Sequence, residues 1–303
     1  MCIYSIGEAL IDFMPQEDGF IPAIGGAPAN VAACAAKLGA EAYFIGKVGE
    51  DLFGNRIIDG LQSVGVKTRY VSKTDCANTA LAFVALKPNG DREFSFYRNP
   101  SADMFLEPED VKEIAFKNGD ILHFCSVDLI DMPVKDATKF CIEACKAAGG
   151  VISFDPNVRA NLWKDIEQYR KVIREFIPIA DIVKLASDEC EFVYGIDDID
   201  AVANTILETA KQVIITFGGE GSKLYTHENV IVQKPYPIQC VDTTGAGDTF
   251  IGTYLRYYKE KGSREAMLLA SAASAMVCTK KGVLTSLPSE KELEQFMRDK
   301  NYE

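Results

Sequence analysis

Residues 242–250 read Asp-Thr-Thr-Gly-Ala-Gly-Asp-Thr-Phe and lead directly into an apolar run that extends to Tyr258. The two glycines allow a sharp turn at the point where that run starts a helix. The first N–H groups of a helix lack intrahelical partners, so Gly245, Ala246 and Gly247 are expected to bind an anion. The helix start also favours the ionised form of Asp248, which can accept a proton from a hydroxyl group. These features indicate phosphoryl transfer to an alcohol. A plain glycine turn with a capping aspartate is the alternative.

The composition is that of an ordinary globular protein and excludes several kinds of partner. The 303 residues, 48% of them apolar, suffice for one large α/β domain with a small addition or for two modest domains. A net charge of −12 opposes binding to nucleic acid and to anionic membranes. No apolar run reaches the roughly 20 residues of a membrane helix, and no signal-peptide pattern opens the chain, so we expect a cytoplasmic protein.

The nine cysteines contain no paired Cys-x-x-Cys motif, and we expect them to be reduced core or helix residues. Cys141 and Cys145 share one face of an expected helix, but the chain has only two histidines, so a zinc site is not expected. His123 lies in an apolar strand. A hydrogen-bonded core side chain is its expected role.

Short apolar runs alternate with helical patterns along most of the chain, which favours a mostly parallel sheet. Strands are expected at 2–6, 42–47, 121–125, 151–154, 182–185 and 213–216, with a hairpin at 222–225 and 230–233. Helices are expected at 31–38, from 51, and at 132–148, 246–261 and 264–279. The runs 79–86 and 92–97, joined by Pro88-Asn89-Gly90-Asp91, indicate a second hairpin. Such a hairpin can cover a cleft and exclude water from a phosphoryl-transfer site.

Polar residues follow the first strand. Asp12 is expected just beyond the end of a central strand, where open α/β sheets bind ligands. Gly25 and Gly26 allow a ligand to approach the backbone before Pro28 starts a helix, and Asn30 is expected to face the same cleft. Asp12 and Asn30 would suit the hydroxyl groups of a sugar. A solvated turn at Asp12 and a helix start without a ligand are the alternatives.

Five segments resemble the PfkB (ribokinase-like) family of carbohydrate kinases, in the family's order: 25–30, 97–103, 155–159, 216–221 and 242–250. Ala-Pro-Ala-Asn at 27–30 and Phe-Tyr-Arg-Asn-Pro at 96–100 are more similar to fructokinases than to ribokinases. The resemblance spans essentially the whole chain. It implies one kinase domain over 1–303, a three-layer α/β/α sandwich with a mostly parallel central sheet, and a small β-sheet lid from about 13–24 and 72–103.

The resemblance implies an ATP-dependent kinase that phosphorylates the 6-hydroxyl of D-fructose, with Asp248 as the base and 245–247 as the anion hole. It implies substrate contacts for Asp12, Gly25, Gly26, Asn30, Arg98, Asn157 and Arg159. It implies nucleotide contacts for Lys184, Thr216, Gly218, Gly221, Gly245 and Gly247. A surface ion pair for Arg98 and simple turn formation for Asn157 stay open. Neither a P-loop at Gly46-Lys47-Val48 nor a dinucleotide fingerprint at 216–221 fits the spacing.

Mg²⁺ is the expected ion, with K⁺ at a second site. Family members organise magnesium through water with an Asn-x-x-Glu motif. Here Ala186 stands at the Asn position and Glu189 at the Glu position, so an ordinary exposed helix glutamate is the alternative for Glu189. Asp242 is implied to border the monovalent cation, near 280–282.

Two other functions stay open at this stage. One is a PfkB kinase for ribose, 2-keto-3-deoxygluconate or a nucleoside. The other is a catalytically silent sugar-binding regulatory subunit, which Ala186 favours and the intact Gly-Ala-Gly-Asp opposes. Because exposed strand edges invite pairing, a homodimer through the lid is expected. The sequence leaves sugar anomer, nucleotide preference and oligomeric state undetermined.

Overall fold

A nine-stranded sheet forms the centre of the computed structural model, which describes residues 1–86 and 92–300. Its strands are β1 (Cys2–Ile6), β4 (Glu41–Gly49), β5 (Lys67–Thr74), β8 (Ile121–Cys125), β9 (Val151–Asp155), β10 (Ile182–Ala186), β11 (Gln212–Thr216), β12 (Ser222–Thr226) and β13 (Val230–Gln233). They lie in the order β13-β12-β11-β10-β9-β8-β1-β4-β5. Only the pairs β11–β12 and β12–β13 are antiparallel. The expected mostly parallel sheet is confirmed.

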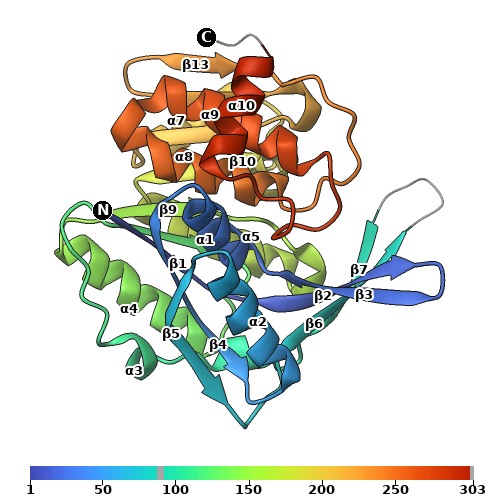
Figure 1. Ribbon diagram of the computed structural model, residues 1–303. Coiled ribbons are helices and arrows are strands. Elements are labelled where there is room, and N and C mark those ends of the chain that lie inside the picture. The colour runs from blue at the N-terminus through green and yellow to red at the C-terminus, as the bar shows by residue number, and fades with distance from the viewer. Residues whose placement is uncertain (87–91, 301–303) are drawn as a thin grey trace.

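Helices cover both faces of this sheet (Figure 1). One face carries α1 (Ala27–Lys37), α2 (Leu52–Ser63), α8 (Ala246–Lys261), α9 (Ser263–Val277) and α10 (Glu290–Asp299). The other carries α3 (Pro108–Val111), α4 (Pro133–Ala147), α5 (Ile166–Phe176), α6 (Ser187–Tyr194) and α7 (Ile199–Leu207). Successive strand residues point to opposite faces, so Ile3 belongs to one buried cluster and Tyr4 to the other. The expected three-layer α/β/α sandwich is confirmed.

Short 3₁₀ turns join several of these elements: η1 (Ala102–Phe105), η2 (Ala160–Leu162), η3 (Ile177–Ile179) and η4 (Gly218–Glu220). In the described part of the chain, no helix has both the length and the apolar character that crossing a membrane requires.

A four-stranded sheet projects from the body of the molecule (Figure 1). Its strands are β2 (Leu10–Gln16), β3 (Gly19–Gly25), β6 (Ala80–Leu86) and β7 (Arg92–Tyr97), in the order β3-β2-β6-β7. The central pair β2–β6 is parallel and the two outer pairs are antiparallel. The expected strands 79–86 and 92–97 correspond to β6 and β7, while their turn at 88–91 lies outside the described residues. Residues 72–74, which we expected in this small sheet, are the end of β5 in the large one.

Asp12 and a pair of stacked aromatic rings lie on opposite faces of the small sheet. Asp12 lies opposite Ala82 in the register, and Ala82 lies opposite Phe96, so these three side chains share a face. The other face carries Phe13 and Phe83, whose rings stack with centroids 4.7 Å apart. Asp12 follows the central strand β1, as expected, but the alternative of a solvated turn is wrong. The chain leaves β1 and enters β2 within a few residues, so Asp12 lies inside a strand of the small sheet.

Strand β3 continues into α1 with only Gly26 between them. Gly26 has φ +104°, and a Cβ there would lie 2.5 Å from the carbonyl oxygen of Glu8. Only glycine fits this junction without strain. Pro28 occupies the first turn of α1, as expected, although the helix begins earlier than the predicted 31–38.

Six cysteines are buried, which agrees with the expected core positions: Cys34, Cys125, Cys141, Cys145, Cys190 and Cys278. Cys76 and Cys240 are exposed, so the expectation is wrong for these two. His123 is fully buried, and its Nδ1 lies 3.0 Å from the hydroxyl oxygen of Ser153. Burial lowers the pKa of His123 to about 3, so it is a neutral core side chain, as expected.

Helices α1 and α8 approach closely at Gly252. A Cβ at Gly252 would lie 3.0 Å from the Cβ of Cys34 and 3.1 Å from the carbonyl oxygen of Val31. We expect Gly252→Val to lower the free energy of unfolding by about 1–3 kcal/mol, because added methyl groups must push the two helices apart. The shift of the urea midpoint measures this effect.

Gly219→Ala is the matched control, since a Cβ at Gly219 meets no atom within 4 Å. We expect that variant to stay within about 0.5 kcal/mol of the parent protein. Equal midpoints for the Gly252→Val and Gly219→Ala proteins would contradict the close-packing argument.

Candidate active site

The carboxylate of Asp248 is held by two amide groups from distant parts of the chain. Nδ2 of Asn30, on α1, donates to Oδ2 at 2.8 Å, and Nδ2 of Asn157, after β9, donates to Oδ1 at 3.0 Å. Asp248 itself lies in the first turn of α8 and is buried. Asn157 has φ +46°, a left-handed conformation that directs its side chain into this network.

Burial dominates the electrostatics of Asp248. It raises the pKa of this carboxyl, while the amide of Asn30 and the positive charge of Arg159 act in the opposite direction. The sequence predicted that the helix start would favour the ionised form. The structure corrects this, because loss of water outweighs the favourable partners. A carboxylate with a raised pKa is also a better proton acceptor.

The turn before Asp248 has the glycine geometry that the sequence indicated. Gly245 has φ +73°, and a Cβ there would lie 2.7 Å from the side chain of Val283. The N–H of Ala246 donates to the carbonyl of Thr243 at 3.2 Å, so it is already used and the expected anion contact is corrected for this residue. For the N–H groups of Gly245 and Gly247, no acceptor occurs within residues 1–86 and 92–300. These two amides can bind an anion.

Three hollows meet at this turn. The inner cavity is lined by Glu8, Leu10, Asp12, Gly26, Ala27, Asn30, Phe96, Arg98, Val127, Asn157, Arg159, Leu162, Thr244, Gly245 and Asp248. The groove contains Asn157, Arg159, Lys184, Glu189, Asp242, Gly245, Gly247 and Asp248. The outer cavity, of about 570 Å³, includes Thr216, Gly218, Gly221, Gly247 and Phe250. Asp248 therefore lies where the inner cavity opens into the groove, and Gly247 lies where the groove meets the outer cavity.

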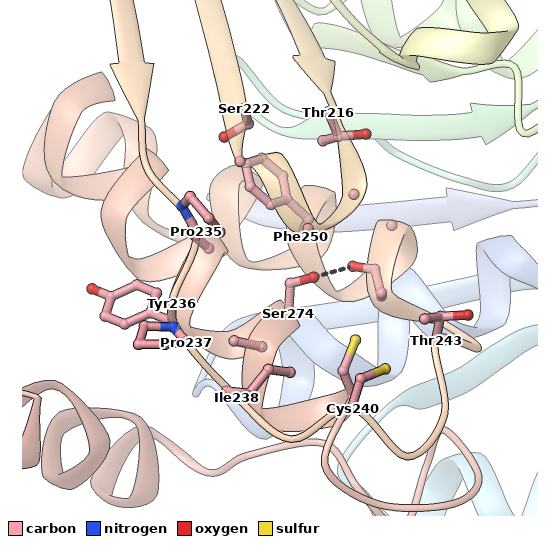
Figure 2. Close-up of a pocket in the computed structure, with 18 residues that line it drawn as sticks. Thr216, Ser222, Pro235, Tyr236, Pro237, Ile238, Cys240, Thr243, Phe250 and Ser274 are labelled. Carbon is pink, nitrogen blue, oxygen red and sulfur yellow. Dashed lines mark hydrogen bonds between the residues drawn. The ribbon is translucent and has the colours of Figure 1, made fainter.

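The outer cavity lies between the strand ends of β11 and β12, the segment after β13 and helix α9 (Figure 2). Thr216 and Ser222 stand at one end, and Phe250 lies between them and the glycine turn. The hydroxyl of Ser274 donates to the carbonyl of Ala246 at 3.0 Å, which ties α9 to the turn (Figure 2).

Nearly all the residues expected at the substrate site line the inner cavity. Gly25 is the exception, because it lies behind Asp12, where a Cβ would come within 2.0 Å of Asp12 Oδ2. Its role is therefore to leave room for the Asp12 carboxylate.

Arg98 is buried, so the alternative of a surface ion pair is wrong. Its Nε donates to Asp103 Oδ2 at 2.7 Å, and its Nη2 pairs with Asp128 Oδ1. The guanidinium group thus braces the cavity wall through two carboxylates. Sequence reasoning assigned no role to Asp103 or Asp128, nor to Glu8 in the same wall, and the five-residue spacing of Arg98 and Asp103 was the only local signal.

Glu189 is also buried, so the alternative of an exposed helix glutamate is wrong. Its Oε1 accepts the N–H of Val158 at 2.6 Å and its Oε2 accepts the N–H of Ala186 at 2.8 Å. Glu189 therefore ties the segment after β9 to the end of β10, beside the groove. No group of three or more histidine, cysteine or acidic side chains forms a metal cage in the described residues.

Lys184 supplies positive charge behind the turn. Its Nζ lies 2.9 Å from Asp155 Oδ2, and a Cβ at Gly247 would lie 3.0 Å from the same Nζ. Burial opposes the charge on Lys184, but the carboxylates of Asp155 and Glu189 outweigh burial and raise its pKa. The ammonium group of Lys184 therefore lies next to the glycine turn at 245–247.

Asp242 links the two turns that flank α8 and α9. Its Oδ1 accepts the N–H of Thr244 at 2.7 Å, and its Oδ2 accepts the N–H of Gly282 at 3.4 Å. The carboxylate is buried between these segments.

Comparison with known proteins gives full-length matches. Residues 3–290 match the model of the pfkB family of carbohydrate kinases. Fructokinase-1 of Oryza sativa subsp. japonica is 41% identical, over 97% of this chain and 97% of its own. A structure of Vibrio cholerae O395 fructokinase with fructose, ADP and calcium has a TM-score of 0.91 at 30% identity, covering 97% of this chain and 98% of that one. A structure of Salmonella enterica aminoimidazole riboside kinase, with aminoimidazole riboside and an ATP analog, has a TM-score of 0.90 at 28% identity, covering 98% and 100%.

Proposed function

The chain belongs to the pfkB family of carbohydrate kinases, and we infer that it transfers the γ-phosphate of ATP to the 6-hydroxyl of D-fructose. The full-length identity of 41% to a fructokinase is the observation that carries this conclusion. The chemistry of the site agrees with it. A buried carboxylate with a raised pKa directly follows a turn in which the N–H groups of Gly245 and Gly247 have no acceptor among the described residues. The enzyme is a phosphotransferase with an alcohol acceptor.

The inner cavity is our proposed sugar site. Asp12 and Asn30 can bind hydroxyl groups of the sugar, with Gly26, Asn157 and the bracing Arg98 completing the wall. Asp248 would accept the proton of the 6-hydroxyl as that oxygen attacks the γ-phosphate. The N–H groups of Gly245 and Gly247 would stabilise the charge on the transferring phosphoryl group.

The outer cavity and the groove are our proposed ATP site. The cavity volume of about 570 Å³ is in the range of small-molecule sites, and Thr216, Gly218 and Gly221 border it. Arg159 and Lys184 lie along the groove, where they can neutralise phosphate charge. The small sheet would act as a lid that excludes water from the sugar end.

The donor set fits a magnesium ion that is held mostly by phosphate and water, as this ion prefers. Both oxygens of Glu189 already accept N–H groups, so its contact with the metal would run through water. When bound, the ion would neutralise charge on the β- and γ-phosphates.

Asp242, buried beside the turn at Gly282, is our proposed neighbour of a K⁺ ion. Comparing turnover in potassium and in tetramethylammonium salts would test the K⁺ site.

A nucleoside is the second candidate substrate. The specific observation in its favour is the TM-score of 0.90 with aminoimidazole riboside kinase. Ribose and 2-keto-3-deoxygluconate stay in the test panel. The complete hydrogen-bond network around Asp248 opposes a catalytically silent binding subunit, even though Ala186 replaces the family's asparagine.

Two further proposals concern the state of the protein in the cell: a homodimer and a cytoplasmic location. The small sheet exposes Phe20, Ile21 and Tyr97 to 49%, 53% and 63%, and β3 and β7 are its edges. An exposed apolar surface next to strand edges favours pairing with a second copy. Cell fractionation would test the location.

We expect the purified protein to release ADP from Mg-ATP with fructose, and not with ribose, glucose, 2-keto-3-deoxygluconate or adenosine. Asp248→Asn should lower kcat by about 10²–10⁴-fold while fructose and ATP still bind, because only the proton acceptor is lost. Asp136→Asn, in the first turn of α4, is the matched control and should have the kcat of the parent. Unchanged turnover in Asp248→Asn would remove Asp248 from the mechanism. Turnover on another member of the panel alone would change the substrate.

We expect Asp12→Ala to raise KM for fructose by about tenfold or more, because a buried sugar hydroxyl loses its charged acceptor. KM for ATP should stay close to the parent value. Asp18→Ala, at the exposed tip of the same hairpin, is the control. If Asp12→Ala and Asp18→Ala have the same KM for fructose, Asp12 does not bind the sugar.

Light scattering should give twice the chain mass of 33.3 kDa for the parent protein. A Phe20→Asp, Ile21→Asp double variant should give the monomer mass, because buried aspartates without partners destabilise the contact. Dimers that survive this double substitution would show that another surface pairs.

A further inference from the structure

Two buried carboxyl groups face each other beside the inner cavity. Glu8 and Asp128 are 4% and 3% exposed. Glu8 follows β1 and Asp128 follows β8, and these strands are neighbours in the large sheet. Both side chains therefore reach the same edge of the sheet, close to the residues that surround Asp248.

Each carboxyl group has one oxygen with a donor and one without. Oε1 of Glu8 accepts the N–H of Ala27 at 3.0 Å, and Oδ1 of Asp128 accepts from Arg98. Oε2 of Glu8 and Oδ2 of Asp128 are buried, and neither receives a donor from the described residues as long as both groups are ionised. Oδ2 of Asp128 lies 2.8 Å from the position that a Cβ would take at Gly7, the residue next to Glu8, and burial and the nearby Glu8 side chain both raise the pKa of Asp128. A single proton between them turns one oxygen into a donor and satisfies both.

The charges around Arg98 also favour one bound proton, because three carboxyl groups surround a single positive charge. Glu8, Asp103 and Asp128 surround one guanidinium group, that of Arg98. Asp103 is further fixed by the hydroxyl of Ser101. Burial raises the pKa of Glu8 to about 7 against the opposing effect of Arg98, and burial raises the pKa of Asp128 as well. The buried thiol of Cys125 is a further titratable neighbour of Glu8, and Asp12 and Asp248 line the same cavity as Glu8.

Glu8 also takes the place of a helix cap. Gly26, the N-cap of α1, has no side chain to accept the first N–H groups of the helix, and Glu8 accepts that of Ala27 instead. Asn30, one turn further along α1, donates to Asp248. The start of α1 is thus fixed from the same carboxyl pair that faces the sugar cavity.

We propose that Glu8 and Asp128 share one proton and together act as a positioning pair, which holds the start of α1, and through it Asn30, in register with Asp248. The pair goes beyond the proposed sugar and ATP contacts, and only its kinetic test rests on the fructokinase activity.

The backbone at Gly7 lies close to both Asp128 and the start of α1. A Cβ at Gly7 would lie 2.6 Å from Cγ of Pro28 and 2.8 Å from Oδ2 of Asp128. Asp128 and the first turn of α1 therefore pack against the same point of the backbone. When the proton is lost, the two like charges repel and displace the start of α1. Loss of the proton therefore weakens the alignment of Asn30 with Asp248.

The sign of the pH dependence follows from proton linkage. Between the ordinary glutamate pKa of 4.5 and the folded value of about 7, the folded protein keeps the proton of Glu8 and the unfolded chain does not. Stability contributed by the pair is therefore present at low pH and is lost as pH rises through the folded pKa. KM for fructose should therefore increase as the pH rises through the same range.

The test compares Glu8→Gln, Glu8→Ala and the control Asp120→Asn. Glutamine can accept the N–H of Ala27 with its oxygen and donate to Asp128 with its nitrogen, so it replaces the shared proton with a fixed one. Asp120 is a buried carboxylate at the opposite end of β8, where it accepts the N–H of Cys2. KM and kcat for fructose are measured from about pH 6 to about pH 10.

We expect a stepwise rise of KM with pH in the parent and in Asp120→Asn, and no step in Glu8→Gln. Glu8→Ala should raise KM by about tenfold at every pH, because the N–H of Ala27 and the oxygen of Asp128 lose their partner. Infrared spectra at neutral pH should contain a protonated carboxyl band that Glu8→Gln removes and Asp120→Asn keeps. A parent spectrum without that band overturns the proposal, as does a pH step that persists in Glu8→Gln. Because infrared spectra need no substrate, they decide the matter even if fructose is not turned over.

Discussion

A carboxylate that is removed from water needs donors from the protein, and the site is built around this requirement at Asp248. Its two donors come from α1 and from the segment after β9, so two elements must reach the first turn of α8. Tight packing of α1 on α8 at Gly252 makes this approach possible. The position of Asp248 is therefore a property of the whole sandwich and not of its own helix.

The second constraint is the space around the turn. Gly245 must adopt a left-handed conformation against Val283, and Gly247 must leave room for the ammonium group of Lys184. Side chains at either position would displace the amides that face the groove. Because of these two glycines, the short turn at 245–247 can border the inner cavity, the groove and the outer cavity. An acceptor alcohol and a phosphate group can therefore both reach this turn.

The sequence predicted the fold well, because the apolar strands and the strand and helix alternation are local signals. It also identified Asn30, Asn157 and Asp248, which carry the family's motifs. It did not predict that Asp12 lies inside a strand, because the partner of β2 is β6, far along the chain, and no local pattern reports such a pairing. For the same reason it left open whether Arg98 and Glu189 are buried or exposed. Their respective partners, Asp128 and the N–H of Val158, lie in the segments that follow β8 and β9.

The direct passage from β3 through Gly26 into α1 places two groups of the site on one stretch of backbone. Asp12 lies on β2, which pairs with β3, and β3 leads through Gly26 to Asn30, the donor to Asp248. The wall of the inner cavity and a partner of the buried carboxylate are therefore mechanically continuous, so the placement of one depends on the placement of the other.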